Sequence, residues 1–261
     1  MRLQQKIVFV TDADSPTGSA MIRRFADEGA HFILNSLSDG SAIASELAYC
    51  ESVQAKAMVV TADLWRGSEV ASVLAEAERK IGTVDVLIHN NNKVLPASVE
   101  ACDEDTFTNV MNYNAKSAFL CTQAVGKQMY AKQSGKIVYI SSIHAEKPTG
   151  SSFVYSVSRS SLKMLAREAA LELGRYNINV NTIEVGPVAG DNETFKSGLS
   201  TLYEDYTYKV PRAELGTPDD IANCALFLAT DESRFINGAD IRLDGGFVLH
   251  YMNHKMKKPS S

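Results

Sequence analysis

The sequence predicts an α/β protein with a doubly wound parallel sheet, and three observations carry that prediction. Short apolar segments alternate with longer segments of helical periodicity along most of the 261 residues, which is typical of strands joined by crossover helices. The opening stretch KIVFVTDADSPTGSAMIRRFADEGAHFILNS reads as strand, turn, helix and strand, the unit in which a phosphate binds at the helix N-terminus. No Pro/Gly/Ser-rich linker or internal repeat interrupts the pattern, so we expect one Rossmann-like domain over residues 1–250, with about seven strands and helices on both faces.

The predicted strands are short, apolar and rich in β-branched residues. In chain order they cover residues 7–10, 32–34, 57–60, 84–89, 136–140, 179–184 and 239–243. The predicted helices between them cover residues 18–28, 40–50, 68–81, 106–133, 155–176 and 218–229. Before the first helix, Ser15 suits the N-cap and Pro16 the first turn. The helix 155–176 carries an apolar stripe at helical spacing, which we interpret as core and subunit interface.

The composition is that of an ordinary globular protein, with 45% hydrophobic and 22% charged residues. A net charge of −5 gives no indication of a nucleic-acid or anionic-membrane partner. No apolar run approaches the ~20 residues that span a bilayer, and the N-terminal stretch has no signal-peptide pattern. The four cysteines are far apart, and the five histidines lack ligand spacing. We therefore expect reduced thiols, a cytoplasmic location and no metal site.

Function is expected at one edge of the sheet. In a doubly wound sheet, ligands bind at the carboxyl ends of the strands, where the strand order reverses. The segments that follow the predicted strands are therefore the candidates. They are residues 11–18, 35–37, 63, 89–93, 141–142 and 185–190.

Several motifs occur in or beside these segments in a fixed order. Asp63 follows the third strand, DVLI lies in the fourth, and Asn114 precedes SAFLCTQA. Further on come GKIVYISSI, then Tyr155 thirteen residues after Ser142, and then INVNTIEVGPV, GTPDDIA and LDGG. By these motifs, which extend over roughly residues 6–247, the chain resembles the short-chain dehydrogenase/reductase family.

The resemblance implies an oxidoreductase that transfers hydride between NAD or NADP and a small carbonyl/alcohol substrate. Tyr155 would be the general acid/base, Ser142 would orient the substrate oxygen, and Asn114 would hold a water in a proton relay. The fourth active-site position, a lysine in the family, is Arg159 here. The resemblance also implies a homo-oligomer, a dimer or a tetramer, that pairs through the helices 106–133 and 155–176.

Arg159 alters the chemistry of this site but keeps its positive charge. A tyrosine ordinarily ionises near pH 10, so it needs a nearby cation to act as a base at neutrality. Arg159 supplies that cation one helical turn after Tyr155. Arginine, however, presents a planar fork and does not give up its proton. It could therefore favour the ionised tyrosine but could not relay a proton.

The resemblance assigns cofactor binding to residues of the first turn and the strand ends. They are Thr11, Ser15, Thr17, Gly18, Ser36, Asp63, Leu64, Asn90, Gly186 and Val188. In the family's T-G-x-x-x-G-x-G turn, the first two glycines are Asp12 and Pro16 here. Gly18 keeps the close helix–strand packing, whereas Pro16 has no N–H to donate. Carboxylates at Asp12 and Asp14 are expected to face the pyrophosphate, each weakening binding by roughly 1.5–3 kcal/mol at ~6 Å.

Further departures lie on the later strand ends. The family's N-N-A-G after the fourth strand is HNNN here, and the bulk of Asn91 and Asn92 is expected to crowd the adenosine side. Val185 and Gly190 stand where the family has a proline and a threonine, so a usual nicotinamide contact is missing. The choice between NAD and NADP stays open, because the second strand ends near Ser36 with neither an adjacent acid nor a base.

Several residues also have a purely structural interpretation. Ser15-Pro16 suits a well-capped helix that no longer binds pyrophosphate tightly. Tyr155 could pack without reacting, Asp63 could only initiate a helix, and His89 is interpreted as a strand-end histidine rather than a ligand.

Because the departures cluster on the cofactor cradle, two other functions remain hypotheses. One is a non-catalytic or cofactor-independent protein that keeps the fold for binding or assembly. The other is a pocket for a small ligand that has no pyrophosphate. Residues 191–212, which are polar and aromatic, are expected to form a substrate or lid loop, and residues 251–261 a flexible basic tail.

Overall fold

The computed structural model describes residues 1–190 and 206–249. Within this part of the chain, seven parallel strands form one sheet in the order β3-β2-β1-β4-β5-β6-β7. The strands are β1 (Ile7–Val10), β2 (His31–Asn35), β3 (Ala57–Val60), β4 (Val86–His89), β5 (Gly135–Ser142), β6 (Ile178–Val185) and β7 (Asp240–Leu243). The order reverses between β1 and β4, which places a crevice at their carboxyl ends. The predicted fold class is confirmed.

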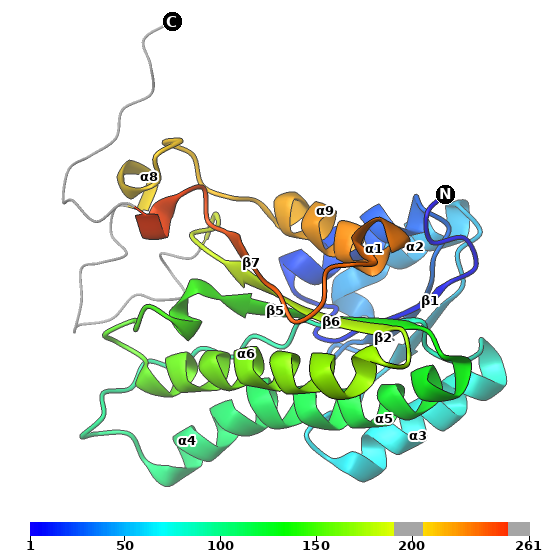
Figure 1. Ribbon diagram of the computed structural model, residues 1–261, viewed down its shortest axis with the longest axis horizontal. Helices are drawn as coiled ribbons and strands as arrows, with labels where there is room; N and C mark the ends of the chain where they lie inside the picture. Colours follow the sequence, from blue (N-terminus) through cyan, green and yellow to red (C-terminus); the bar gives the residue numbers. More distant parts are fainter. Residues whose placement is uncertain (191–205, 250–261) are drawn as a thin grey trace, which may run out of the picture.

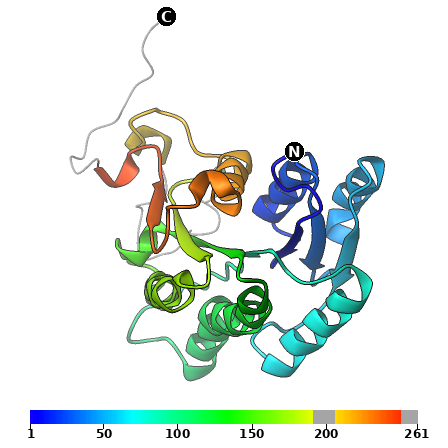
Figure 2. The ribbon, with the colours of Figure 1, turned by 45° about the vertical axis from the view of Figure 1, so that its right-hand side comes forward.

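Helices cover both faces of this sheet (Figure 1, Figure 2). On one face lie α1 (Pro16–Ala26), α2 (Ala44–Ser52) and α9 (Pro218–Ala229). On the other lie α3 (Gly67–Lys80), α4 (Glu104–Met111), α5 (Ser117–Lys132) and α6 (Phe153–Gly174). The other described helical segments are short: η1 (Ser41–Ile43), η2 (Asn112–Lys116), η3 (Ile143–Ala145), α8 (Tyr206–Lys209), η4 (Asp231–Ser233) and η5 (Phe247–Leu249).

The strands separate two apolar cores, because successive side chains point to opposite faces of a sheet. In β1, Val8 and Val10 pack in the core on the α1 side, and Phe9 packs in the core on the α5 side. All three side chains are fully buried. Burial on both faces explains why the central strands are continuously apolar, and it holds the strand ends at the crevice in fixed positions.

The predicted helix 106–133 occurs as one continuous helical stretch, 104–132, but it is not a uniform α-helix. The structure divides it into α4, the π-helical turn η2 and α5. Within η2, Asn114 is fully buried and its amide is bonded to the backbone of Lys93 and to the hydroxyl of Ser158. A π-helical turn is an insertion that often marks a functional site. Hydrophobic periodicity does not reveal it, since the apolar pattern continues on both sides.

The other predicted elements occur where expected. Their ends are shifted by one or two residues, and the predicted helix 40–50 begins as the 3₁₀ turn η1 before it becomes α2. Such shifts are ordinary for helix and strand ends, which local sequence determines weakly.

The turn between β1 and α1 keeps a glycine-like shape without its first two glycines. Asp12 has φ of 50°, in the left-handed region that aspartate tolerates better than most residues. Ser15 caps α1, because its Oγ accepts a hydrogen bond from the N–H of Gly18 at 3.1 Å, and Pro16 is the first helical residue. A Cβ at Gly18 would lie 2.5 Å from the carbonyl oxygen of Ala13. The helix start predicted from Ser15-Pro16 and the close packing predicted for Gly18 are confirmed.

The expected substrate or lid loop, residues 191–212, lies largely outside the described residues, and the expected tail, residues 251–261, lies wholly outside them. None of the helices in the described ranges is long and apolar enough to cross a membrane.

Candidate active site

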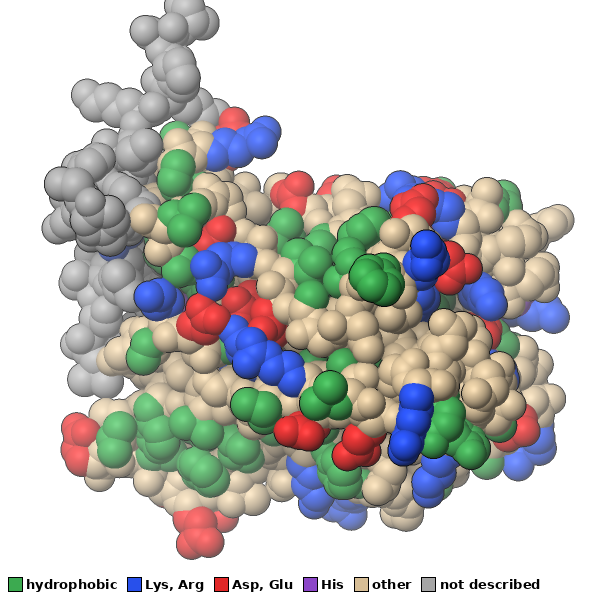
Figure 3. Space-filling view, viewed as in Figure 1, with side chains coloured by type: hydrophobic (Ala, Val, Ile, Leu, Met, Phe, Trp, Pro, Cys, Tyr) green, Lys and Arg blue, Asp and Glu red, His purple; other side chains and the backbone are tan. Residues whose placement is uncertain are grey.

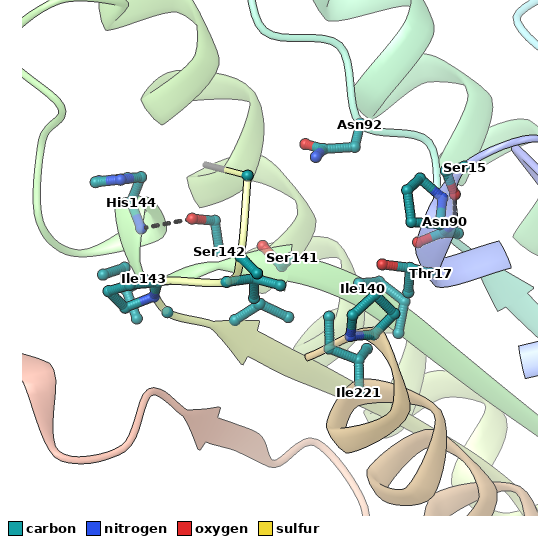
Figure 4. A pocket seen from close by; sticks show the side chains of 18 of the residues that line it. Ser15, Thr17, Asn90, Asn92, Ile140, Ser141, Ser142, Ile143, His144 and Ile221 are labelled. Atoms are coloured by element: carbon teal, nitrogen blue, oxygen red, sulfur yellow. Dashed lines mark hydrogen bonds between the residues drawn. The ribbon is translucent and has the colours of Figure 1, made fainter. Parts of the chain in front are cut away.

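A cavity of about 290 Å³ opens at the carboxyl ends of the central strands. Figure 4 shows Ser142 and His144 on one side of it and Ser15 and Thr17 on the other, with Asn92 reaching toward the space between them. Of the residues predicted for the site, seven line this cavity: Ser15, Thr17, Asn90, Ser142, Tyr155, Gly186 and Val188. Seven do not: Thr11, Gly18, Ser36, Asp63, Leu64, Asn114 and Arg159.

Tyr155 and Ser142 come together at this cavity from α6 and from the end of β5. Both side chains are nearly buried, with 3% and 6% of their surface exposed. The Tyr155 hydroxyl donates to Oδ1 of Asn92 at 3.1 Å. The Ser142 hydroxyl accepts from the backbone N–H of His144 at 3.2 Å, which leaves its own proton to donate. Two hydroxyl groups therefore meet the cavity where a substrate oxygen could bind.

Arg159 lies behind Tyr155 and is fully buried. Its guanidinium carbon is 4.8 Å from the centre of the Tyr155 ring. The same group donates to the carbonyl oxygen of Asn91 at 2.9 Å and to Oδ1 of Asn92 at 2.7 Å. Among the described residues, Arg159 forms no ion pair with a carboxylate within 4.0 Å. The positive charge is thus held inside the site by neutral oxygens, directly against the tyrosine.

Asn92 lines the cavity, and the sequence did not identify it as a site residue. Its position was interpreted as added bulk at a family glycine, but its Oδ1 accepts hydrogen bonds from both Tyr155 and Arg159. Asn91 turns away from the cavity and donates instead to the carbonyl oxygen of Tyr113 and the hydroxyl of Ser117. Of the two asparagines, only Asn92 adds bulk to the cavity, and it does so on the side of Tyr155. A polar residue at a position the family reserves for glycine was the available signal.

Asn114 lies on the π-helical turn η2 and does not line the cavity. Its Oδ1 accepts from the N–H of Lys93 at 2.8 Å, and its Nδ2 donates to the carbonyl oxygen of Lys93 and to the hydroxyl of Ser158. The side chain thereby fixes the loop that carries Asn92. Its amide oxygen accepts one of these bonds, and its amide nitrogen donates the other two.

The predicted phosphate side of the cavity is formed by the first turn and the end of β4. The Ser15 hydroxyl accepts from Nδ2 of Asn90 at 2.8 Å, and the Thr11 hydroxyl accepts from the N–H of Asn90 at 2.8 Å. These bonds join the turn to β4, and Thr11 itself is fully buried. Ser15, Thr17 and Asn90 remain on the cavity wall.

The two carboxylates of the turn point away from this cavity, which differs from the expectation that both face the pyrophosphate. Asp14 accepts from the backbone N–H of Ser38 at 2.9 Å and from its hydroxyl at 3.1 Å. The Tyr113 hydroxyl and the backbone N–H of Asn92 lie next to the Asp12 carboxylate and act to lower its pKa. Burial, together with the neighbouring charge of Asp14, raises the pKa of Asp12 to about 6. Burial and the proximity of Asp12 raise the pKa of Tyr113 in turn.

The residues predicted for the adenosine side lie apart from the cavity. The buried Ser36 hydroxyl accepts from the N–H of Gly40 at 2.7 Å. Asp63 pairs with Arg66 at 3.3 Å, and Leu64 is in the core. On the opposite wall, a Cβ at Gly186 would lie 2.4 Å from Cβ of Asp244, so the segment after β6 packs closely against the segment after β7.

His89, at the end of β4, is fully buried and pairs with the Ser117 hydroxyl at 2.8 Å. Burial, with a smaller effect of the Arg159 charge, lowers the pKa of His89 to about 3. The imidazole is therefore neutral at physiological pH, consistent with the strand-end interpretation.

The residues present fit a dinucleotide. At the position of the family's first glycine, Asp12 adopts a φ of 50°, in the left-handed region that favours glycine. Both acidic side chains are engaged by Ser38, Tyr113 and Asn92 instead of facing the cavity. The wall next to the start of α1 carries no carboxylate. The Ser15 hydroxyl and the Asn90 amide already donate within the turn, so an anionic group there meets the Thr17 hydroxyl beside a helix N-terminus.

Comparison with known proteins agrees with this geometry. The family model described as enoyl-(acyl carrier protein) reductase matches residues 13–248. An NAD-dependent glycerol dehydrogenase from Listeria innocua is 27% identical over 248 residues, which cover 95% of each chain. A 3-oxoacyl-(acyl-carrier-protein) reductase from Thermotoga maritima is 28% identical over 249 residues, covering 95% of this chain and 100% of that one.

A crystal structure of a short-chain dehydrogenase/reductase from Burkholderia xenovorans superposes with a TM-score of 0.86 at 28% identity, covering 95% of this chain and 98% of that one. The family match extends over nine-tenths of the chain, and the order of motifs predicted the same relationship. The chain belongs to the short-chain dehydrogenase/reductase family.

Proposed function

We propose that this protein is an NAD(P)-dependent oxidoreductase that interconverts a carbonyl compound and an alcohol. The observation that carries the proposal is the placement of the Tyr155 and Ser142 hydroxyls on one cavity, with the Arg159 cation against the tyrosine ring. The named activities of the relatives, a glycerol dehydrogenase and a 3-oxoacyl reductase, are of this class.

The dinucleotide would be held by the polar wall of the cavity. Ser15, Thr17, Gly186 and Val188 line the cavity, and we assign the first two to the phosphates and the last two to the nicotinamide side by resemblance. Thr11, Gly18 and Asn90 would support this wall by fixing the turn against β4. Ser36, Asp63 and Leu64 stay our assignment for the adenosine end, by resemblance. The bound nicotinamide supplies or accepts the hydride.

In the proposed mechanism, Tyr155 transfers the proton. During reduction its hydroxyl donates to the substrate oxygen, and during oxidation its phenolate accepts the proton. Ser142 donates a hydrogen bond to the same oxygen and orients the carbonyl. Arg159 stabilises the phenolate by its charge, but it stays protonated throughout. Asn114 positions the loop that carries Asn92, and in our proposal any relay water is held by its backbone rather than its fully engaged side chain.

We propose NAD as the preferred coenzyme. The carboxylate of Asp14 lies at the carboxyl end of β2, bonded to Ser38, where a 2′-phosphate would be repelled. A ribose diol carries no such charge. The expected preference is at least about tenfold in Kd for NADH over NADPH, and Asp14→Asn should reduce it.

We also propose a homo-oligomer. Apolar side chains are exposed along α5 and α6, including Phe119, Met164 and Leu171. Beside them a shallow groove of about 530 Å³ runs between these helices, and Figure 3 shows hydrophobic side chains gathered over α4 and α6. A face of this kind is typical of a subunit interface. A dimer or tetramer is expected by light scattering, and Leu171→Glu should shift the mass toward the monomer. With its four thiols unpaired, we place the protein in the cytoplasm.

The test of the proposed function separates binding from chemistry. NADH and NADPH are titrated by fluorescence and calorimetry into the wild-type protein, Tyr155→Phe and the control Tyr49→Phe. We expect all three to bind NADH, and Tyr155→Phe alone to lose about 10²–10⁴-fold in kcat on a panel of carbonyl compounds. Absence of NADH and NADPH binding at millimolar concentration contradicts the proposal and supports a non-catalytic protein. Equal kcat for the two tyrosine variants contradicts the role of Tyr155.

A further inference from the structure

Asn92 stands between the two groups that define the proposed active site. Its Oδ1 is 3.1 Å from the Tyr155 hydroxyl and 2.7 Å from Nη2 of Arg159. The orientation of this amide is determined by its neighbour, because a guanidinium has only hydrogens to donate. The oxygen of the amide must face Arg159, and the same oxygen faces Tyr155.

An amide oxygen accepts hydrogen bonds and cannot donate them. The tyrosine must therefore supply the proton of the 3.1 Å bond, which it can do only while it is protonated. If Tyr155 ionised, its phenolate would face a carbonyl oxygen, and rotating the amide would turn its NH₂ group toward Arg159. A hydrogen bond made only by the neutral form favours the neutral form.

Resting on the proposed function, we propose that Asn92 is a positioning residue. It holds the Tyr155 hydroxyl as a proton donor and accepts a hydrogen bond from the guanidinium of Arg159. Asn92 thereby favours the protonated tyrosine, whereas the Arg159 charge alone would favour the phenolate. The enzyme in this state is prepared for reduction of a carbonyl, where the first requirement is a protonated Tyr155. Oxidation of an alcohol requires Asn92 to release the hydroxyl.

Two other titratable groups lie near Tyr155 and Asn92, His144 and Asp12. His144, from η3, lies with its ring centre 6.2 Å from that of Tyr155. Its Nδ1 is bonded to the carbonyl oxygen of Lys147, and burial lowers its pKa. The Asp12 carboxylate, from the first turn, lies next to the backbone N–H of Asn92 and so anchors the loop that carries Asn92. Val94, Leu215 and Phe247 also pack against Tyr155.

The experiment measures the ionisation of Tyr155 in the protein without cofactor. Tyrosinate absorbance is recorded against pH for the wild type, Asn92→Ala and Asn92→Asp. Each is paired with its Tyr155→Phe counterpart, so that the difference isolates Tyr155 among the ten tyrosines. Lys93→Gln is the control on the same loop, because its side chain bonds Asn109 and not Tyr155. Thermal melting verifies that each variant is folded.

We expect the midpoint for Tyr155 to fall by about one pH unit or more in Asn92→Ala. In Asn92→Asp it should rise, because a carboxylate is a stronger acceptor and repels a phenolate. Lys93→Gln should match the wild type. If Asn92→Ala is unfolded, Asn92→Gly, which restores the family residue, must show the same fall. Unchanged midpoints, or shifts of the same sign in the alanine and aspartate variants, overturn the inference.

In the active enzyme, Asn92→Ala should move the pH profile of alcohol oxidation to lower pH, with about a tenfold gain in rate at neutrality. The titration needs no nicotinamide, so it can succeed even if NADH fails to bind. In that outcome the proposed function is wrong and the coupling of Asn92 to Tyr155 stands. If NADH binds but the midpoint for Tyr155 is the same in all variants, the proposed function stands and the coupling of Asn92 to Tyr155 is wrong.

Discussion

The guanidinium of Arg159 lies against the ring of Tyr155, with its carbon 4.8 Å from the ring centre. A cation over an aromatic face is attracted by the ring quadrupole, and here the pair is buried. The contact gives Arg159 two tasks, since it supports the position of the tyrosine and places a fixed charge beside its hydroxyl.

Removal of that charge should move the pH dependence of catalysis. We predict that Arg159→Met shifts the alkaline rise of alcohol oxidation to higher pH and lowers kcat at neutrality by about ten- to a hundredfold, because the phenolate loses its counter-charge. Arg159→Lys keeps the charge and should retain the pH profile. The measurement is kcat against pH for both variants. Identical profiles for the methionine and lysine variants would show that the charge has no effect.

Neutralisation of Asp12 should stabilise the fold above pH 6. The folded-state pKa of Asp12 is about 6, above its ordinary value of 3.8, so the folded state binds the proton more tightly than the unfolded state. This group therefore lowers stability as pH rises from about 4 to 6, and the loss remains above that range. We predict that Asp12→Asn, which keeps a residue tolerant of positive φ, gains on the order of 1–2 kcal/mol at pH 7.

Asp39 provides the matched control for this prediction. It has a φ of 53° but is exposed. Urea unfolding at pH 4 and pH 7 should show that Asp12→Asn gains stability only at the higher pH, whereas Asp39→Asn follows the wild type at both. A gain of equal size at both pH values would assign the effect to the backbone instead of the carboxylate.

His89 should make the protein sensitive to acid. Its folded-state pKa is lowered to about 3 by burial, below the ordinary value near 6.5. The stability that its neutral form contributes is present above pH 6.5 and is lost as pH falls from there toward 3. We predict that His89→Asn loses less stability than the wild type between pH 7 and pH 4, by roughly 2–3 kcal/mol. In NMR, the His89 ring should show no titration above pH 4, and a midpoint near 6.5 would contradict the burial argument.

Gly18 should not tolerate a side chain. A Cβ there would lie 2.5 Å from the carbonyl oxygen of Ala13 and 2.7 Å from that of Asp12, so α1 or the turn must move. We predict that Gly18→Ala costs about 1–3 kcal/mol in the free energy of unfolding and weakens NADH binding. Gly67→Ala, at the start of α3, meets only a side-chain carbon at 3.7 Å and should be neutral or stabilising. Equal stability of the two variants in urea would refute this prediction.

Patterns that are local in the chain predicted much of this protein. The alternation of apolar runs and helical periodicity predicted the sheet and its helices, because both signals depend on neighbours a few residues away. Ser15-Pro16 predicted the start of α1 for the same reason. The spacing from Ser142 to Tyr155 predicted two residues that do meet at the cavity. The π-helical turn at Asn114 was not predicted, because the apolar pattern continues on both sides of it and its amide bonds Lys93, twenty-one residues away.

The sequence by itself determined the family, the sheet and which hydroxyls meet at the carboxyl ends of the strands. The tertiary structure decided where the unusual residues of the cradle point. Asp12 and Asp14 turn to Tyr113 and Ser38, and Asn92 turns to Tyr155 and Arg159. The direction of a side chain depends on which donors the fold brings within about 3 Å, and those donors lie on other elements of the chain.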